Sequence, residues 1–236
     1  MSTSLHRRAL TRSLAAAIGA LAAPALAVGP PANAGVTRIG LADAFLLLDQ
    51  YLALKPAQRD RFQLAYRAVR KGKPAPDVKA QIIHRDHSTT PLAVDADGWV
   101  TQLPTLDQLK RRETFEVDGP DFDMAMELRA TLAPADRLAV PELAATLAQV
   151  NAAMVIFSDG DPGAVGHGLA CVYFPDAGTG RAILADASER PLPVFDFKLI
   201  GPTPYLDMRA QPRPVTVALA RTPSRIVMAG PPRGRG

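Results

Sequence analysis

The residues best suited to chemistry lie in the glycine-rich segment SDGDPGAVGHG, at positions 158–168. A loop of this kind can bring a hydroxyl, two carboxylates and an imidazole onto a divalent ion, or it can form a serine hydrolase site. However, the serine is not in a Gly-x-Ser-x-Gly turn, and glycine and aspartate are equally common in exposed turns. An exposed turn is the interpretation we favour. The candidate catalytic residues are Ser158, Asp159, Asp161 and His167.

A second polar segment, HRDH at 84–87, offers two imidazoles and a carboxylate. His84, Asp86 and His87 are the candidate metal ligands. In an extended strand His84 and Asp86 share one face and His87 points the other way. We therefore expect a solvated surface segment and no bound metal.

The segment VDADGW, at 94–99, resembles part of a calcium-binding loop. An EF-hand needs oxygen ligands at positions one, three, five and twelve, with glycine at six. Placing Gly98 at six puts Ala93 at one and Pro104 at twelve, and neither supplies a side-chain oxygen. We predict a β-hairpin over 88–104, with Gly98 at positive φ.

The single cysteine, Cys171, cannot form a disulfide within the chain. It lies in the apolar run GLACVYF, which is typical of a buried strand. A nucleophilic cysteine needs a histidine partner, and only His167, four residues earlier, suggests one. No phosphate-binding glycine loop, paired zinc motif or dinucleotide fingerprint occurs, so we expect no cofactor.

The pattern of apolar residues predicts an α+β protein. We expect helices near 41–71, interrupted at Pro56, and near 134–151. Strands are expected at DVKAQIIHRD, TFEV and DMAMELRATL, and then at VIFS, LACVYF, RAILAD, LPVFDFKLIG, PVTVALA and RIVMA. A short helix is the alternative for DMAMELRATL, and the tight turn before it favours a strand. The segment TLDQLKRR is expected to be a polar linker, and no helix is expected after residue 155.

The chain also contains a short internal match at an offset of one hundred residues. IIHRDHSTTPLAV, from residue 82, aligns with AILADASERPLPV, from residue 182. PAQR at 56–59 and PADR at 134–137 each open an expected helix before one copy. We therefore predict two similar helix-then-antiparallel-β units, β-sandwich-like, at 36–132 and 133–228, with a flexible tail at 229–236. The shared Asp-x-Ser is interpreted as turn chemistry.

The first residues have the composition of an export signal. Three arginines precede the short apolar run SLAAAIGALA, and PALA ends in the small-x-small pattern that signal peptidase recognises. The run is too short for a membrane anchor, because Pro24 interrupts it. We expect a signal peptide at 1–27, with a second cleavage site after Ala34. HRRALTR resembles a twin-arginine signal, and both this route and the general secretory route stay open.

The charge balance excludes a nucleic-acid-binding surface. Of the 27 basic residues three lie in the leader, which leaves 24 basic against 23 acidic residues. The densest basic run, RAVRKGK at 67–73, is typical of the end of a helix. Binding to nucleic acid needs basic residues clustered on one face, so no nucleic-acid partner is expected.

The hairpin followed by Leu-Pro, VDADGWVTQLP, resembles turns in carboxypeptidase-regulatory or transthyretin-like β-sandwich modules. The Gly-x-Tyr element that follows in that family is replaced by TLDQLKRRETF. The resemblance implies a small sandwich used for adhesion, binding or support.

These observations together predict an exported protein, periplasmic or secreted, without a transmembrane anchor in the mature chain. We expect a non-catalytic module with a structural, binding or assembly role and a periplasmic or envelope protein as its partner. The alternative is a hydrolase or a metal-dependent enzyme that uses the 158–167 loop.

Overall fold

The computed structural model describes residues 35–119, 121–158, 168–197 and 199–232. The leader, most of the 158–167 loop and the last four residues lie outside this part. The fold is a β-rich α+β fold, with 19% helix and 38% strand, mostly in antiparallel sheets. The chain divides into two compact units, and it passes from one to the other near residues 54, 63 and 126. We call them the first unit (22–54 and 64–126) and the second unit (55–63 and 127–236), leaving the N-terminal segment aside.

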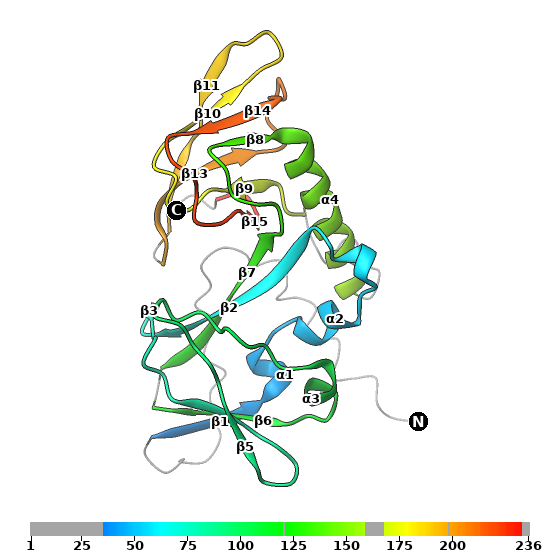
Figure 1. Cartoon of the computed structure of the whole chain (residues 1–236), viewed down its shortest axis with the longest axis vertical. Coiled ribbons are helices and arrows are strands. Elements are labelled where there is room, and N and C mark those ends of the chain that lie inside the picture. The colour runs from blue at the N-terminus through cyan, green and yellow to red at the C-terminus, as the bar shows by residue number, and fades with distance from the viewer. Residues whose placement is uncertain (1–34, 120, 159–167, 198, 233–236) are drawn as a thin grey trace. The chain divides into compact units, whose positions relative to one another are not determined.

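The first unit is built on a four-stranded antiparallel sheet with the order β1-β6-β4-β5 (Figure 1). Strand β4 pairs with β6 on one side and with β5 on the other, in a tight hairpin. Strand β2 begins in the second unit and continues in the first, and strand β7 begins in the first unit and continues in the second. The elements are β1 (Val36–Gly40), α1 (Leu41–Ala44), α2 (Leu48–Ala53), β2 (Phe62–Arg70), β3 (Lys73–Pro74), β4 (Ala80–Ile83), β5 (Thr89–Pro91), α3 (Leu106–Lys110), β6 (Thr114–Asp118) and β7 (Phe122–Ala130).

An aromatic core holds the first unit together. The ring of Phe45, which follows α1, lies 5.1 Å from that of Tyr66 on β2 and 6.0 Å from that of Phe115 on β6, both edge to face. These three side chains are almost completely buried. The Tyr66 hydroxyl donates a hydrogen bond of 2.7 Å to the Leu46 carbonyl, which satisfies its polar end inside an apolar environment.

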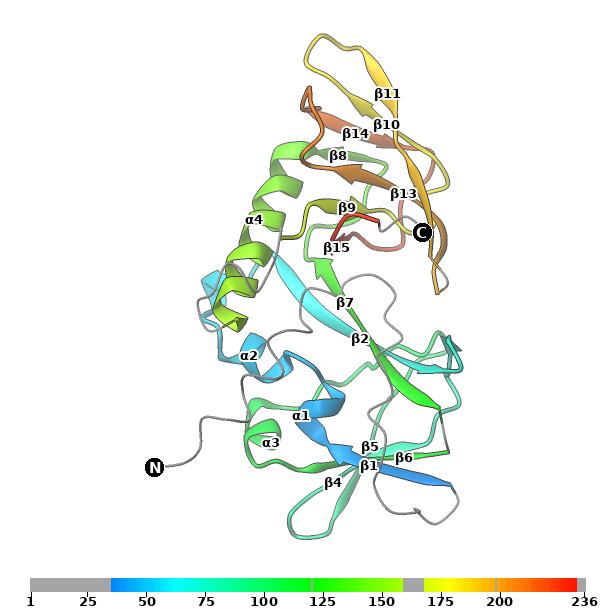
Figure 2. The same ribbon diagram turned by 180° about the vertical axis from the view of Figure 1, so that it is seen from behind.

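The second unit contains a four-stranded sheet, β11-β10-β14-β8, and a second set of strands ordered β12-β13-β9-β15-β7. Figure 2 shows the β10–β11 hairpin extending from β14. The elements are η2 (Pro56–Gln58), β8 (Arg137–Ala139), α4 (Val140–Phe157), β9 (Cys171–Tyr173), β10 (Gly180–Ile183), β11 (Glu189–Pro191), β12 (Val194–Phe197), β13 (Gly201–Asp207), β14 (Thr216–Leu219) and β15 (Val227–Ala229).

Helix α4 is the longest helix of the described residues. Pro141 lies in its first turn, where its missing N–H costs no helical hydrogen bond. Its buried residues recur at spacings of three and four, from Leu143 to Phe157. By length and composition α4 is apolar enough to cross a membrane. Its Gln149, however, bonds the Ala57 carbonyl and the Asp60 carboxylate, as a helix packed inside a protein does.

Three expected elements are wrong. Residues 62–70 form β2 instead of a helix, because Phe62, Leu64 and Tyr66 alternate with more exposed residues at a period of two. VIFS belongs to the last turn of α4, which ends after residue 155, at Phe157. The polar linker contains α3, where Thr105 and Gln108 form a reciprocal capping box.

The motifs PAQR and PADR also do not open helices of the expected length. Pro56 begins a single 3₁₀ turn, and residues 134–137 precede β8, so the helix expected from 134 begins at Val140. The helix expected near 41–71 is reduced to α1, α2 and that turn.

The other strands that the sequence predicts overlap observed strands. DVKAQIIHRD overlaps β4, TFEV overlaps β6, and DMAMELRATL overlaps β7. The predicted strands from LACVYF onwards overlap β9, β10, β12, β14 and β15, whereas β1, β3, β8, β11 and all but the first residue of β13 lie in segments for which no strand was predicted. Each of the predicted segments carries its apolar residues in a short run between turn residues, which is the pattern that predicted them.

The turn predicted at Asp95–Gly98 is confirmed. Val94 and Val100 form an antiparallel bridge, and Gly98 has φ +85°. The Asp95 carboxylate accepts hydrogen bonds from the backbone N–H groups of Asp97 and Trp99, at 2.9 and 2.8 Å. The carboxylate is thus engaged by its own turn, as in an Asx-turn.

Candidate functional site

The structure places one residue of the candidate loop, Ser158, at the end of α4. Its side chain is buried, and its hydroxyl donates to the Val155 carbonyl at 2.9 Å. This position closes the helix and does not present a nucleophile. The other three candidates lie outside the described residues. Just after the candidate loop, the backbone N–H and C=O of Leu169 both form hydrogen bonds with the side-chain amide of Asn151.

The three candidate ligands of HRDH do not converge. Strand β4 ends at Ile83, so His84, Asp86 and His87 lie in a turn, and the strand geometry expected for them is wrong. Asp86 Oδ1 accepts hydrogen bonds from the Ser88 hydroxyl at 2.6 Å and the Ser88 N–H at 3.0 Å. His87 has φ +67° in the same turn. Among the described residues, no group of three or more His, Cys, Asp or Glu could hold a metal ion.

The hydrogen bonds from Ser88 change the acidity of the turn. Chiefly through the side-chain bond and then the backbone bond, Ser88 lowers the pKa of the Asp86 carboxyl below its ordinary value. Asp186 has the same two bonds from Ser188 and a pKa lowered for the same reason. Both carboxylates are exposed, so they act as turn residues.

His84 belongs to a relay of three side chains within the first unit. Its Nδ1 lies 2.9 Å from Glu113 Oε2, and its Nε2 lies 2.7 Å from Thr90 Oγ1. The Glu113 side chain is only 3% exposed and that of His84 is 20% exposed, whereas Thr90 lies on an exposed strand. An imidazole held between a buried carboxylate and an accessible hydroxyl can move a proton from that hydroxyl.

The strands of the first unit bring these three residues together. His84 follows β4, Thr90 lies in β5, and Glu113 immediately precedes β6. Because β4 lies between β6 and β5 in the sheet, the imidazole stands between the other two side chains. The sequence pattern indicates His84 as a candidate but not Glu113 and Thr90, since nothing near either of these two residues signals the pairing.

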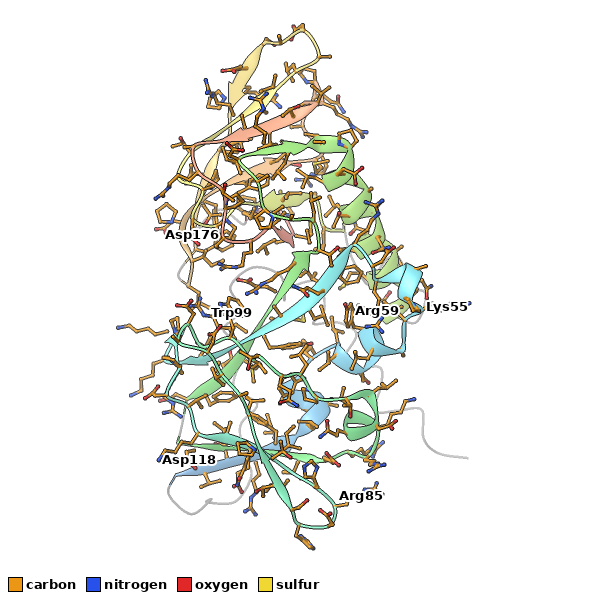
Figure 3. All side chains as sticks on the ribbon, in the orientation of Figure 1. Lys55, Arg59, Arg85, Trp99, Asp118 and Asp176 are labelled. Atoms are coloured by element: carbon orange, nitrogen blue, oxygen red, sulfur yellow. The ribbon has the colours of Figure 1, made fainter. Side chains whose placement is uncertain are left out.

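A pocket of about 550 Å³ adjoins this relay. Arg85 and Arg111 are neighbours in its lining, because Arg85 Nε donates a hydrogen bond to the Arg111 carbonyl at 3.1 Å. Figure 3 labels Arg85 beside the β4–β5 hairpin, with its side chain at the surface. The lining holds two guanidinium groups and two carboxylates, and the carboxylates of Asp86 and Glu113 are engaged by Ser88 and His84. The two guanidinium groups suit a negatively charged group of a ligand. The pocket is lined by His84, Arg85, Asp86, Ser88, Arg111 and Glu113.

Cys171 lies in β9, as predicted, and is fully buried. Burial, and secondarily the charge of Asp207, raises the pKa of its thiol to about 12. A thiol in this environment forms little thiolate and does not act as a nucleophile.

No family model, curated protein or solved structure matches this chain. The resemblance of one hairpin to carboxypeptidase-regulatory or transthyretin-like modules therefore stays a prediction. The functional argument rests on the residues and contacts described above.

Proposed function

We propose that this chain is an exported module with a binding or assembly role, built from two units related by duplication. The arginine-containing, alanine-rich leader supports export to the periplasm or beyond. The observation that carries the rest is the identity of two hairpins, β4–β5 in the first unit and β10–β11 in the second.

The two hairpins share their backbone hydrogen bonds at an offset of one hundred residues. His84 N donates to Ser88 O at 2.9 Å, and Leu184 N donates to Ser188 O at 2.9 Å. The hydroxyls of Ser88 and Ser188 bond Asp86 and Asp186 at the same distance, 2.6 Å. His87 and Ala187, at equivalent positions, have φ values of +67° and +64°.

The two units also share a backbone hydrogen bond between the start of a helix and the residue that precedes a strand. Leu41 N, at the start of α1, donates to Glu113 O at 2.8 Å, and Val140 N, at the start of α4, donates to Val215 O at 3.0 Å. The sheet orders β1-β6-β4-β5 and β8-β14-β10-β11 then correspond strand by strand. In each unit these corresponding elements follow one another along the chain in the order strand, helix, hairpin, strand, with other elements between them.

The two hairpins share the turn residues Asp86 and Ser88 with Asp186 and Ser188, and the strand residues Ile83 and Pro91 with Ile183 and Pro191, whereas the residues between these positions differ. Arg85, His87 and Thr90 correspond to Ala185, Ala187 and Arg190. Most of these side chains point to solvent in an exposed segment. A repeated frame that presents different outward residues is well suited to binding, because loops on a rigid scaffold carry recognition.

We further propose that the first unit has the sandwich-like arrangement that the sequence predicted. Phe115 of β6 contacts Phe122 of β7, with ring centroids 5.6 Å apart, and Phe45 connects β6 with β2. The core therefore lies between β6 of one sheet and the paired strands β2 and β7.

Site-specific photo-crosslinking in living cells tests the binding role. A photoreactive residue at position 85 or 185, each on a hairpin turn, should give one discrete adduct in the periplasmic fraction. The same residue at the exposed Lys73 on β3 serves as the control and should give none. Absence of adducts from both hairpins, or equal adducts from position 73, would overturn the binding role.

The mass of the intact exported protein tests the export proposal. We expect a mature N-terminus at Val28, or at Gly35 if the second cleavage site is used. Replacement of Arg7 and Arg8 by lysine should block export only if the twin-arginine route is used. Recovery of uncleaved chain solely in the cytoplasm would contradict export by either route.

A further inference from the structure

The relay of Glu113, His84 and Thr90 has the proton connectivity of an activated nucleophile. An ionised carboxylate only accepts hydrogen bonds, so the bond to Glu113 requires the proton on His84 Nδ1. The neutral ring then has its lone pair on Nε2, 2.7 Å from Thr90 Oγ1. The Thr90 hydroxyl is thereby the donor to His84, and its proton has a base to receive it.

The burial of the three side chains follows the same order. Exposure rises from 3% at Glu113 to 20% at His84, and Thr90 lies on the exposed edge strand β5. The buried carboxylate of Glu113 orients the ring, and the mostly buried imidazole of His84 lies between it and Thr90. The Thr90 hydroxyl lies at the exposed end, where a substrate can reach it. This is the division of roles in acid–histidine–hydroxyl triads on unrelated folds.

We propose that Thr90 and His84 cleave small acyl esters that carry a negative charge, with Glu113 as a positioning residue. This activity goes beyond the proposed binding role and departs from the expectation of a non-catalytic module. The class of substrate follows from the adjoining pocket, which His84 and Glu113 of the relay line and in which Arg85 and Arg111 can pair with an anionic group. The two carboxylates of the lining, Asp86 and Glu113, are already engaged by Ser88 and His84. Its volume of about 550 Å³ suits a small molecule.

In the first step Thr90 gives its hydroxyl proton to His84 Nε2 while its oxygen bonds to the carbonyl carbon of the ester. The bond from that carbon to the alkoxy oxygen then breaks, and the leaving alcohol takes the proton from His84. The acyl group remains on Thr90 as an ester. Water that loses a proton to His84 releases the acyl group as a carboxylic acid, and His84 returns the proton to the Thr90 oxygen.

The second unit forms the same hairpin turn without this relay. The matching backbone bonds make Leu184 and Val215 the counterparts of His84 and Glu113. Thr90 corresponds to Arg190, which bonds the Gln211 carbonyl. The same hairpin therefore forms with Leu184 and with Val215, which is 43% exposed, in these positions. The buried carboxylate of Glu113, by contrast, needs a partner to offset its desolvation. The relay is an addition to the frame in one unit.

A fluorophosphonate probe, which modifies activated hydroxyls irreversibly, tests the nucleophile directly. After incubation with the purified chain, peptide mass spectrometry should locate the adduct on Thr90. Thr90→Val keeps the shape of the exposed side chain and should abolish labelling, whereas Thr90→Ser should retain it. Thr89→Val, which removes an exposed hydroxyl of the same strand at a position outside the pocket lining, is the matched control and should label as the wild type does.

The role of His84 requires that His84→Leu lose at least about 100-fold in labelling rate. Should that variant unfold, the double variant His84→Leu/Glu113→Val carries the residues of the second unit and replaces it. Glu113→Gln should lower kcat with KM unchanged, which a purely structural role would not do. Absence of an adduct on Thr90 in the folded wild type, or unchanged labelling in the folded double variant, would overturn the proposal.

Two esters test the substrate class. The chain should hydrolyse the anionic 4-nitrophenyl hydrogen succinate with a lower KM than the neutral 4-nitrophenyl acetate. Arg111→Gln should raise KM for the succinate and leave that for the acetate unchanged. Equal KM values for both esters in the wild type would refute recognition of the negative charge.

Discussion

The pair of Glu113 and His84 gives the sharpest test of the energetics of the first unit. We consider His84→Leu, Glu113→Val and the double variant, because Leu184 and Val215 occupy the equivalent positions of the second unit. His84→Leu removes the imidazole from a carboxylate that is only 3% exposed. An unpaired buried charge costs about 3 kcal/mol or more in the free energy of unfolding.

The other single variant should cost much less. In Glu113→Val the imidazole keeps its bond to Thr90 and part of its exposure to water, so we expect a loss of about 1 kcal/mol. The double variant leaves no unpaired group, and we expect a loss of about 1 kcal/mol here too, since apolar replacement of a buried pair is often nearly neutral. The coupling free energy between the two positions is then about 3 kcal/mol.

The assay is urea denaturation followed by the fluorescence of Trp99, the single tryptophan, which lies in the first unit. The matched control is the same cycle on Arg181 and Glu189, an ion pair of the second hairpin with side chains 62% and 44% exposed. Far-ultraviolet circular dichroism follows the control, and its coupling should stay below about 1 kcal/mol. If His84→Leu proves no more destabilising than Glu113→Val, the hydrogen bond between the imidazole and the buried carboxylate is not what stabilises this region.

Three further predictions concern the turns and the thiol. Gly98→Ala should destabilise the chain by about 1 kcal/mol more than Gly72→Ala. Both glycines have positive φ, but only at Gly98 would the added Cβ meet backbone, 3.1 Å from the Ala68 carbonyl oxygen. Equal losses of stability in urea denaturation would contradict this. Cys171 should react with a thiol reagent only after unfolding, because it is fully buried and its pKa is raised to about 12; rapid modification of the native chain would refute it. The pKa of Asp86, followed by NMR, should lie below 3.8 and should rise in Ser88→Ala, and an unchanged pKa in the variant would contradict the assignment. Because the pKa is lower in the folded state, the stability from this turn is present above pH 3.8 and is lost as the pH falls through the pKa of the folded state.

Local turn chemistry is what the sequence predicts best. The hairpin around Gly98 and the equivalent turns at 84–88 and 184–188 depend on residues within a few positions, whose side chains bond their own backbone. No long-range contact is needed to choose these conformations. The strands between such turns are predictable for the same reason, because short apolar runs bounded by turn residues favour extended structure.

Strand β2 was mispredicted because two periods fit the same residues. Phe62, Tyr66 and Val69 match a helical stripe, and Phe62, Leu64 and Tyr66 match an alternating strand. Tertiary packing decides between them, since Tyr66 meets Phe45 in the core, and a single sequence does not show that contact. Propensity is easily overridden by such packing.

The relay was only partly predictable, for a related reason. His84 attracts notice because its type suits chemistry, but its partners are set by the pairing of β4 with β5 and β6. Ile83 opposes both Thr89 and Thr114, and this register brings Thr90 and Glu113 to opposite sides of the imidazole. One residue of slippage on either strand would move these side chains to the other face of the sheet.

The equivalent turns explain why one unit can carry a reactive set of side chains and the other can do without it. Ala187 has a positive φ of +64° although alanine gains no side-chain hydrogen bond there, so the conformation must come from its neighbours. The bonds from Ser188 to Asp186 supply it, and Ser88 and Asp86 do the same beside His87. Because the frame is held by these two residues, the positions around them, at 84, 85 and 90, are free to change. A side chain at these positions can then be chosen for its chemistry without loss of the turn, which is the property that the proposed duplication requires if its two copies are to diverge in function.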